Sequence, residues 1–95
     1  MRIKLAILLL VLMGLTHAQA QEKSISGTVT DHNSLPLPGV NIIIKGTATG
    51  TLTDFDGHYA INAEKGQTLV FSYVGQETVE INVSDANIIN VQLNE

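Results

Sequence analysis

Residues 37–75 read LPGVNIIIKGTATGTLTDFDGHYAINAEKGQTLVFSYVG. Short runs rich in β-branched and aromatic residues alternate here with turns that contain Gly, a pattern typical of antiparallel strands. At the centre, Asp56-Gly57 lies between two extended runs. This dipeptide favours a type I′ hairpin turn, because Gly adopts positive φ freely and Asp tolerates it. The stretch therefore predicts a small antiparallel β domain in which Asp56 and Gly57 form a structural turn.

The alternation of apolar and polar residues continues on both sides of this stretch. Turn-forming residues recur about every 8–12 positions, which is typical of a β-sandwich. No segment shows a helical period, and no internal repeat is present. We therefore expect an all-β domain, a seven-stranded antiparallel β-sandwich. The expected strands are residues 24–30, 40–45, 51–53, 58–62, 68–74, 78–83 and 89–94.

The first twenty residues have the pattern of a secretory signal peptide. Arg2 and Lys4 form a positive start, residues 5–15 are apolar, and Ala18-Gln19-Ala20 is a small-x-small cleavage site. The apolar run is shorter than the roughly 20 residues that a transmembrane helix needs. We expect cleavage after Ala20, with residues 21–95 exported as one domain. The chain has no cysteine, so packed strands alone must stabilise this domain.

The charge balance narrows the class of partner. The chain has 5 basic and 9 acidic residues and a formal net charge of −4. An acidic surface without a basic cluster argues against binding to nucleic acid or to anionic lipid headgroups. The acidic side chains also have a simpler role, which is to keep an exported domain soluble.

The Asp54-x-Asp56-Gly57 run raises the question of a calcium loop, because EF-hand loops place carboxylates at alternate positions before a Gly. The register does not fit. The first ligand position would be Leu52, and the twelfth, normally a bidentate Glu, would be Ala63. A hairpin turn already accounts for the run, so the sequence predicts no metal site.

His32 and His58 are the other candidate chemical groups. Either could pair with Asp54 or Asp56 as a metal or acid–base set. Both histidines lie in or beside polar turns, however, with no third ligand at a sensible spacing, which favours solvated histidines. No nucleophile elbow, phosphate loop or Ser/His/Asp grouping occurs. The sequence therefore predicts a protein that is not an enzyme and that carries no cofactor.

Two features are candidates for contact with a partner. Tyr59, Phe71 and Tyr73 alternate as core residues should, which leaves Phe55, at the turn, as the aromatic ring expected to be exposed. Ile43 and Val70 are apolar on the strand face that alternation assigns to solvent. If their strands share a sheet, the two side chains form an outer patch suited to protein docking. The alternatives are a central strand covered on both sides and apolar side chains that are merely tolerated at the surface.

Four segments in order resemble a known family. They are ISGTVTD (residues 25–31), PLPGVNIIIKGT (36–47), TGTLTDFDGHYAI (49–61) and LVFSYVGQE (69–77). The chain is similar to the carboxypeptidase-regulatory-like domain, and the similarity covers nearly all of residues 25–93. The resemblance implies a prealbumin-like, Ig-like sandwich of seven strands.

Similar domains are found at the start of SusC/RagA-type TonB-dependent outer-membrane transporters, directly after the signal peptide. The resemblance therefore implies a non-catalytic accessory domain of such a nutrient uptake system, at the periplasmic face of the outer membrane. Its partners would be the transporter's plug and barrel or another envelope protein, with carbohydrate as one class of imported ligand. In those transporters a plug and a long barrel follow, whereas this sequence stops at Glu95, so we expect a fragment or a free-standing copy. The alternative is an independent exported module that binds carbohydrate or peptide directly.

Overall fold

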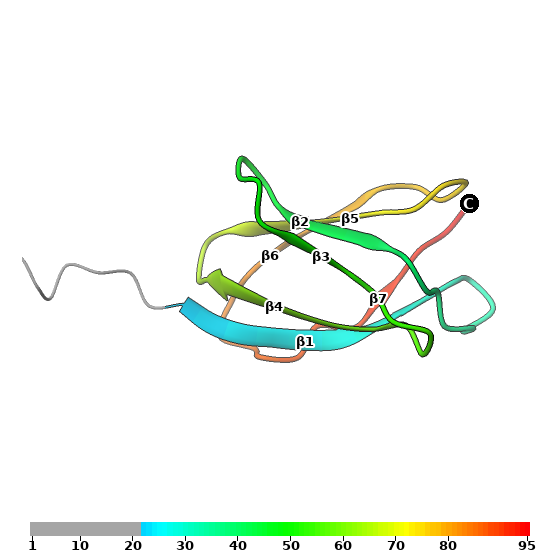
Figure 1. Ribbon diagram of the computed structural model, residues 1–95, viewed down its shortest axis with the longest axis horizontal. Helices are drawn as coiled ribbons and strands as arrows, with labels where there is room; N and C mark the ends of the chain where they lie inside the picture. The colour runs from blue at the N-terminus through cyan, green and yellow to red at the C-terminus, as the bar shows by residue number, and fades with distance from the viewer. Residues whose placement is uncertain (1–21) are drawn as a thin grey trace, which may run out of the picture.

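The computed structural model describes residues 22–95, so the expected signal peptide and its cleavage after Ala20 lie outside the described residues. Two facing β-sheets make up the domain (Figure 1). One has three strands in the order β4-β1-β7, and the other has four in the order β3-β2-β5-β6. Within residues 22–95 no helix is long and apolar enough to cross a membrane. The strands are β1 (Glu22–Thr30), β2 (Asn41–Ile44), β3 (Gly50–Leu52), β4 (His58–Glu64), β5 (Thr68–Ser72), β6 (Val79–Asn82) and β7 (Val91–Gln92).

The core lies between the two sheets and follows from the alternation in the sequence. Every second residue of the longer strands points inward, as period-2 geometry requires. The Tyr59 ring, on β4, packs edge-on against the Phe71 ring, on β5, with centroids 5.4 Å apart. This contact joins the two sheets, and the all-β sandwich prediction is confirmed. The buried apolar residues are Ile25, Val29, Val40, Ile42, Ile44, Tyr59, Ile61, Ala63, Leu69, Phe71, Val83, Val91 and Leu93.

One strand pairing is not antiparallel. β7 runs parallel to β1, with Val91 beside Val29 and Gln92 beside Thr30. The preceding strand, β6, belongs to the other sheet, so residues 83–90 cross the sandwich before the chain joins β1. A parallel pair needs such a crossover connection, whereas a short turn produces only antiparallel neighbours. The expectation of a wholly antiparallel sandwich was therefore wrong for this pair.

The turn at Asp56-Gly57 differs in type from the prediction. The Gly57 amide donates to the Asp54 carbonyl at 3.0 Å, and the amides of Asp56 and His58 both donate to Asp54 Oδ1 at 2.9 Å. Gly57 has a φ of 76°, while Asp56 is not among the residues with positive φ. A type I′ turn needs positive φ at both positions, so that prediction was wrong. The Asp54 side chain stabilises the turn instead.

The strands on either side of this turn do not form a hairpin. β3 pairs with β2 in one sheet, whereas β4 pairs with β1 in the other, from Glu22↔Glu64 to Thr28↔His58. The three residues of β3 could pair with only part of β4, whereas the longer β1 pairs with β4 along its whole length. The turn is thus a corner between the two sheets (Figure 1).

Candidate docking surfaces

The outer face of the four-stranded sheet carries the predicted apolar pair. Ile43 of β2 lies directly opposite Val70 of β5 in the antiparallel register. Both side chains are half-buried, while Ile42 and Ile44 on either side of Ile43 are buried in the core. The structure therefore brings Ile43 and Val70 together on the face turned away from the core, as their alternation predicted.

Neighbouring residues limit this apolar pair to a narrow strip. Gly50 and Glu80 occupy the two ends of the same cross-strand row. Glu80 accepts a salt bridge of 2.9 Å from Lys45, so one border of the strip is charged. Leu52 is exposed on β3, diagonally across from Ile43. The sequence analysis missed Leu52. Thr51 pairs with the buried Ile42 and faces inward, so the alternation of side chains along the strand places Leu52 on the outer face.

The outer face of the three-stranded sheet has a different character. Its outward row pairs Ser24 with Asn62, Ser26 with Ala60, and Thr28 with His58. These six side chains are small or polar, and Ile88, which bridges Ser26, is a single exposed apolar side chain beside them. Among the described residues, the apolar strip of Ile43 and Val70 therefore belongs to the four-stranded sheet, and the three-stranded sheet has no equivalent pair.

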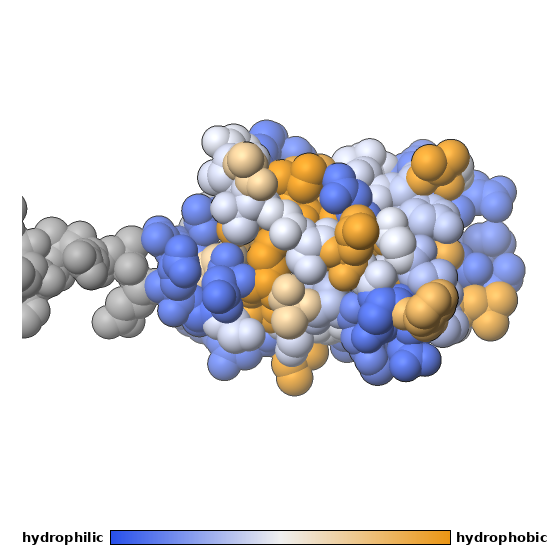
Figure 2. Space-filling model, viewed as in Figure 1, coloured by the Kyte–Doolittle hydropathy of each residue, from blue (hydrophilic) through white to orange (hydrophobic). Residues whose placement is uncertain are grey.

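A second apolar surface lies at one end of the sandwich. Phe55 and Val74 are each 93% exposed, and Leu35 is also exposed. They come from three different connections, β3–β4, β5–β6 and β1–β2, which Figure 1 shows at the end opposite the start of β1. Figure 2 shows apolar side chains at this end, separated by hydrophilic ones. The exposed ring expected at Phe55 is therefore confirmed.

Tyr73 belongs to this end and not to the core. β5 stops pairing at Ser72, and the chain reverses through Gly75, whose φ is 83°. Tyr73 therefore leaves the alternation that buries Leu69 and Phe71, and its side chain is 36% exposed. The prediction that Tyr73 packs in the core was wrong, because β5 ends at Ser72, two residues before the expected end of this strand at residue 74.

Two open hollows lie beside these exposed side chains. One, of about 430 Å³, is lined by Pro38, Gly39, Thr53, Asp54 and Phe55. The other, of about 420 Å³, is lined by Gly39, Asn41, Ser72, Tyr73 and Val74. Gly39 lines both, so the hollows adjoin. The β1–β2, β3–β4 and β5–β6 connections thus form one continuous hollowed surface, with Phe55 at one side and Val74 at the other.

Thr53 lines one of these hollows and is the one polar side chain buried among the described residues. Its Oγ1 donates to the Leu37 carbonyl at 2.5 Å and accepts from the Val40 amide at 2.9 Å. The Thr53 backbone also exchanges hydrogen bonds with Gly39 and Val40. A buried hydroxyl with both partners satisfied locks local geometry, so residues 37–40 are fixed against the end of β3.

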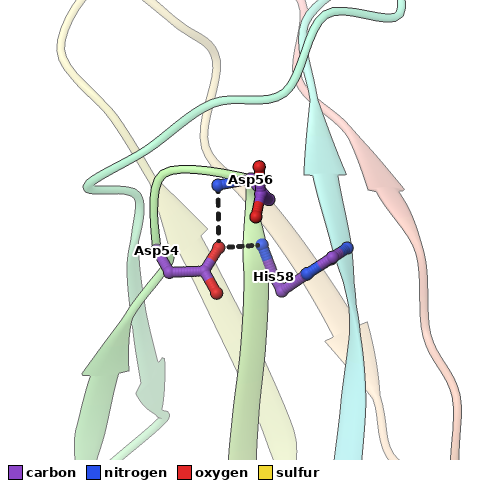
Figure 3. Close-up of side chains that lie close together, drawn as sticks. All are labelled: Asp54, Asp56 and His58. Atoms are coloured by element: carbon purple, nitrogen blue, oxygen red, sulfur yellow. Dashed lines mark hydrogen bonds between the residues drawn. The ribbon is translucent and has the colours of Figure 1, made fainter.

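The sequence analysis found no third ligand to join His58 and an Asp, but the structure gathers three potential metal ligands, so that expectation was wrong. Side-chain ligand atoms of Asp54, Asp56 and His58 lie within 4.8 Å of one another (Figure 3). All three side chains are exposed. One Asp54 oxygen already accepts two backbone hydrogen bonds, so this carboxylate serves the turn. His32, exposed in the β1–β2 connection, is not a member of this cluster.

The two packed sheets and their connections define a small β-sandwich domain. A family model for the CarboxypepD_reg-like domain matches residues 25–95. The chain therefore belongs to the CarboxypepD_reg-like domain family, and the resemblance seen in the sequence is confirmed.

Three relatives of known class are much longer than this chain. It is 49% identical over 86 residues to TonB-dependent receptor P3 of Formosa agariphila, covering 88% of this chain and 8% of the receptor. It is 42% identical to TonB-dependent receptor P39 of the same organism, covering 76% and 7%. It is 37% identical to TonB-dependent receptor SusC of Bacteroides thetaiotaomicron, covering 82% and 8%. The chain thus spans less than a tenth of the length of these receptors.

Solved structures support the fold. A chain in a crystal structure of a type II cohesin–X-dockerin complex from Acetivibrio cellulolyticus aligns with a TM-score of 0.56 and 23% identity, covering 74% of this chain and 52% of that one. A second mutant of that complex gives a TM-score of 0.55 and 24% identity, with 76% and 51% covered. At this level of identity the likeness concerns the β-sandwich alone.

Proposed function

We propose that this protein is a non-catalytic accessory domain of a SusC-like TonB-dependent uptake system and that it acts by protein–protein contact. The observation that carries the proposal is the 37–49% identity to three TonB-dependent receptors over most of this chain. The domain works either as the first domain of a receptor polypeptide or as a separate copy that associates with one. Its place is the periplasmic face of the outer membrane.

The surfaces support contact over catalysis. The described residues offer an apolar strip at Ile43 and Val70 and an apolar end at Phe55 and Val74, and both suit a protein partner. The three clustered ligand side chains are exposed, and one oxygen of Asp54 is committed to the turn. The imported ligand of such a system, including any glycan, would be bound by the receptor and reach this domain only indirectly.

The first test is to read the DNA that follows the codon for Glu95. A reading frame that continues into a receptor identifies the domain as part of that receptor. If the frame ends there, the protein is co-expressed with a SusC-like receptor, crosslinked in the envelope and co-purified. An outer-membrane protein of another class serves as control. The proposal is overturned if the reading frame does not continue into a receptor and the protein does not co-purify with one.

The competing function is an independent exported module that binds carbohydrate or peptide directly. The observation in its favour is the exposed Phe55 ring, since sugar sites use aromatic platforms. Affinity electrophoresis of the purified protein through gels containing polysaccharide separates the two functions. Retardation that is lost in Phe55→Ala supports the carbohydrate module, whereas unchanged mobility in every gel supports the accessory domain.

A further inference from the structure

The charges of this domain are divided between its two ends. The end that carries Phe55 and Val74 is called the acidic loop end. It comprises residues 31–38, 53–57, 73–78 and 93–95, which the ribbon brings together beside the C-terminus (Figure 1). The acidic side chains in these segments are Asp31, Asp54, Asp56, Glu77 and Glu95.

The lysines of the described residues lie elsewhere, and all have partners. Lys45 pairs with Glu80 at 2.9 Å, and Lys65 pairs with Asp85 at 3.0 Å. Lys23 Nζ donates to the Ser84 carbonyl. Within residues 22–95 the acidic loop end therefore has an excess of negative charge with no lysine to compensate it. A cationic group that approaches the domain is drawn towards this end.

The most exposed large apolar side chains lie at the same end. Phe55 and Val74 are each 93% exposed, and the two adjoining hollows lie between them. The Thr53 hydrogen bonds fix residues 37–40 beside these hollows, so a partner would bind a preformed surface. An exposed aromatic ring beside a rigid hollow is the kind of anchor that dominates protein interfaces.

We propose that the acidic loop end binds a basic segment of a separate envelope protein, one in which Lys or Arg side chains alternate with apolar ones. The proposal rests on the function proposed above and specifies its contact surface and the chemistry of its partner. The carboxylates steer the basic segment, and the segment's apolar side chains enter the hollows beside Phe55 and Val74. Charge complementarity decides for a basic partner over an acidic or neutral one.

The test uses the purified protein and three short synthetic peptides. One peptide alternates Lys with Leu, the second alternates Glu with Leu, and the third alternates Lys with Ser. Binding is followed by NMR, and affinity is measured at low and high salt. We expect the Lys/Leu peptide to bind most tightly, to lose affinity as salt rises, and to shift the amide signals of residues 31–38, 53–57 and 73–78.

Matched variants separate this surface from non-specific attraction. Phe55→Asp combined with Val74→Asp should weaken binding by at least about tenfold, because it removes the apolar anchors. Ile88→Asp is the control: Ile88 is 67% exposed but lies beside Ser26 in the middle of β1. It adds the same kind of charge and should change affinity less than about twofold. Glu77→Lys should weaken binding more than Glu22→Lys at the far end does.

Other outcomes overturn the inference. Shifts confined to the face of Ile43 and Val70 would assign the contact to the sheet. Unchanged or tighter binding in Phe55→Asp/Val74→Asp would show charge attraction alone, and equal binding of all three peptides would show no selectivity. The same variants are then tested for receptor co-purification. Wild-type levels in the Phe55→Asp/Val74→Asp variant would overturn this inference while leaving the proposed function in place.

Discussion

The hydroxyl of Tyr59 donates a hydrogen bond of 2.6 Å to the main-chain carbonyl of Ile89. The two residues are far apart in the chain, and the bond holds the crossing segment before β7 against the three-stranded sheet. Gly27 makes this approach possible, since a Cβ at position 27 would lie 1.9 Å from the Ile89 oxygen. The Ile89 amide in turn donates to the Ser26 carbonyl at 2.8 Å. These contacts together fasten the crossing segment to β1 and β4. The residues involved are Ser26, Gly27, Tyr59 and Ile89.

Gly27→Ala should destabilise the protein strongly, because the added methyl group overlaps a backbone carbonyl that cannot rotate away. We expect a loss of about 2 kcal/mol or more, which a shift in the urea midpoint measures. The matched control is Gly66→Ala, where a Cβ meets no atom within 4 Å and the positive φ of 93° adds only conformational strain. That control should cost about 1 kcal/mol. Equal costs at the two positions would contradict the close-approach explanation.

Gly57→Val should also be destabilising, for two reasons that add. Gly57 has a φ of 76°, which a β-branched residue resists, and a Cβ there would lie 2.6 Å from the Val29 carbonyl. We expect a loss of about 2 kcal/mol or more in thermal or urea unfolding. Gly75→Ala, with similar φ but open space, isolates the strain alone. A melting temperature equal to that of the wild-type protein would refute the assigned turn.

Stability should fall at alkaline pH because of Tyr59. Burial raises the pKa of Tyr59 to about 12 from its ordinary value of 10.0. The folded state therefore holds the phenol proton more tightly than the unfolded state does. The associated stability is complete below the unfolded pKa and is lost as the pH rises through that of the folded protein. The expected loss is on the order of 1–2 kcal/mol between about pH 9 and about pH 12.

Urea unfolding across this pH range checks that prediction, with Tyr59→Phe as the comparison. The variant lacks the ionisable group, so its stability should depend less on pH in the same window. It also leaves the Ile89 carbonyl without this donor, and it should be less stable near neutral pH by about 1 kcal/mol. Parallel pH curves for the two proteins would show that Tyr59 is not the group responsible.

Ile43→Asp should leave the fold largely intact while weakening association with a receptor. Ile43 is half-buried on the outer face and Val70 is its cross-strand partner, so a carboxylate there keeps access to water. Val70→Asp should behave similarly, although Glu80 beside it adds repulsion. Circular dichroism and the co-purification assay measure the two properties separately. If either variant is unfolded, the substituted side chain is part of the core, and the docking strip is refuted.

The start of the mature protein remains a prediction from the sequence. Cleavage after Ala20 should leave Gln21, or its cyclised form, as the first residue, and mass spectrometry of the protein recovered from cells measures this directly. Replacing Ala18 and Ala20 with bulky residues should block processing. Recovery of exported protein that still begins at Met1 would contradict the prediction.

Local sequence pattern was sufficient to predict the strands, most of the inward-facing residues and the exposure of Phe55. Ile42, Ile44, Leu69 and Phe71 face inward because side chains alternate along any strand, whatever its partner. The same rule placed Ile43 on the outer face. The rule failed for Tyr73, because the point at which a strand ends depends on its pairing with a neighbouring strand, and β5 ends at Ser72.

Pairing itself was decided by the tertiary structure. Asp56-Gly57 predicted a reversal of the chain but not that β4 would join β1, because hydrogen-bonding partners are chosen by what distant segments can satisfy. The parallel approach of β7 likewise depends on the gap left by Gly27 in β1. The meeting of Phe55 and Val74 at one acidic end has the same origin, since separate connections become neighbours only after the two sheets have packed.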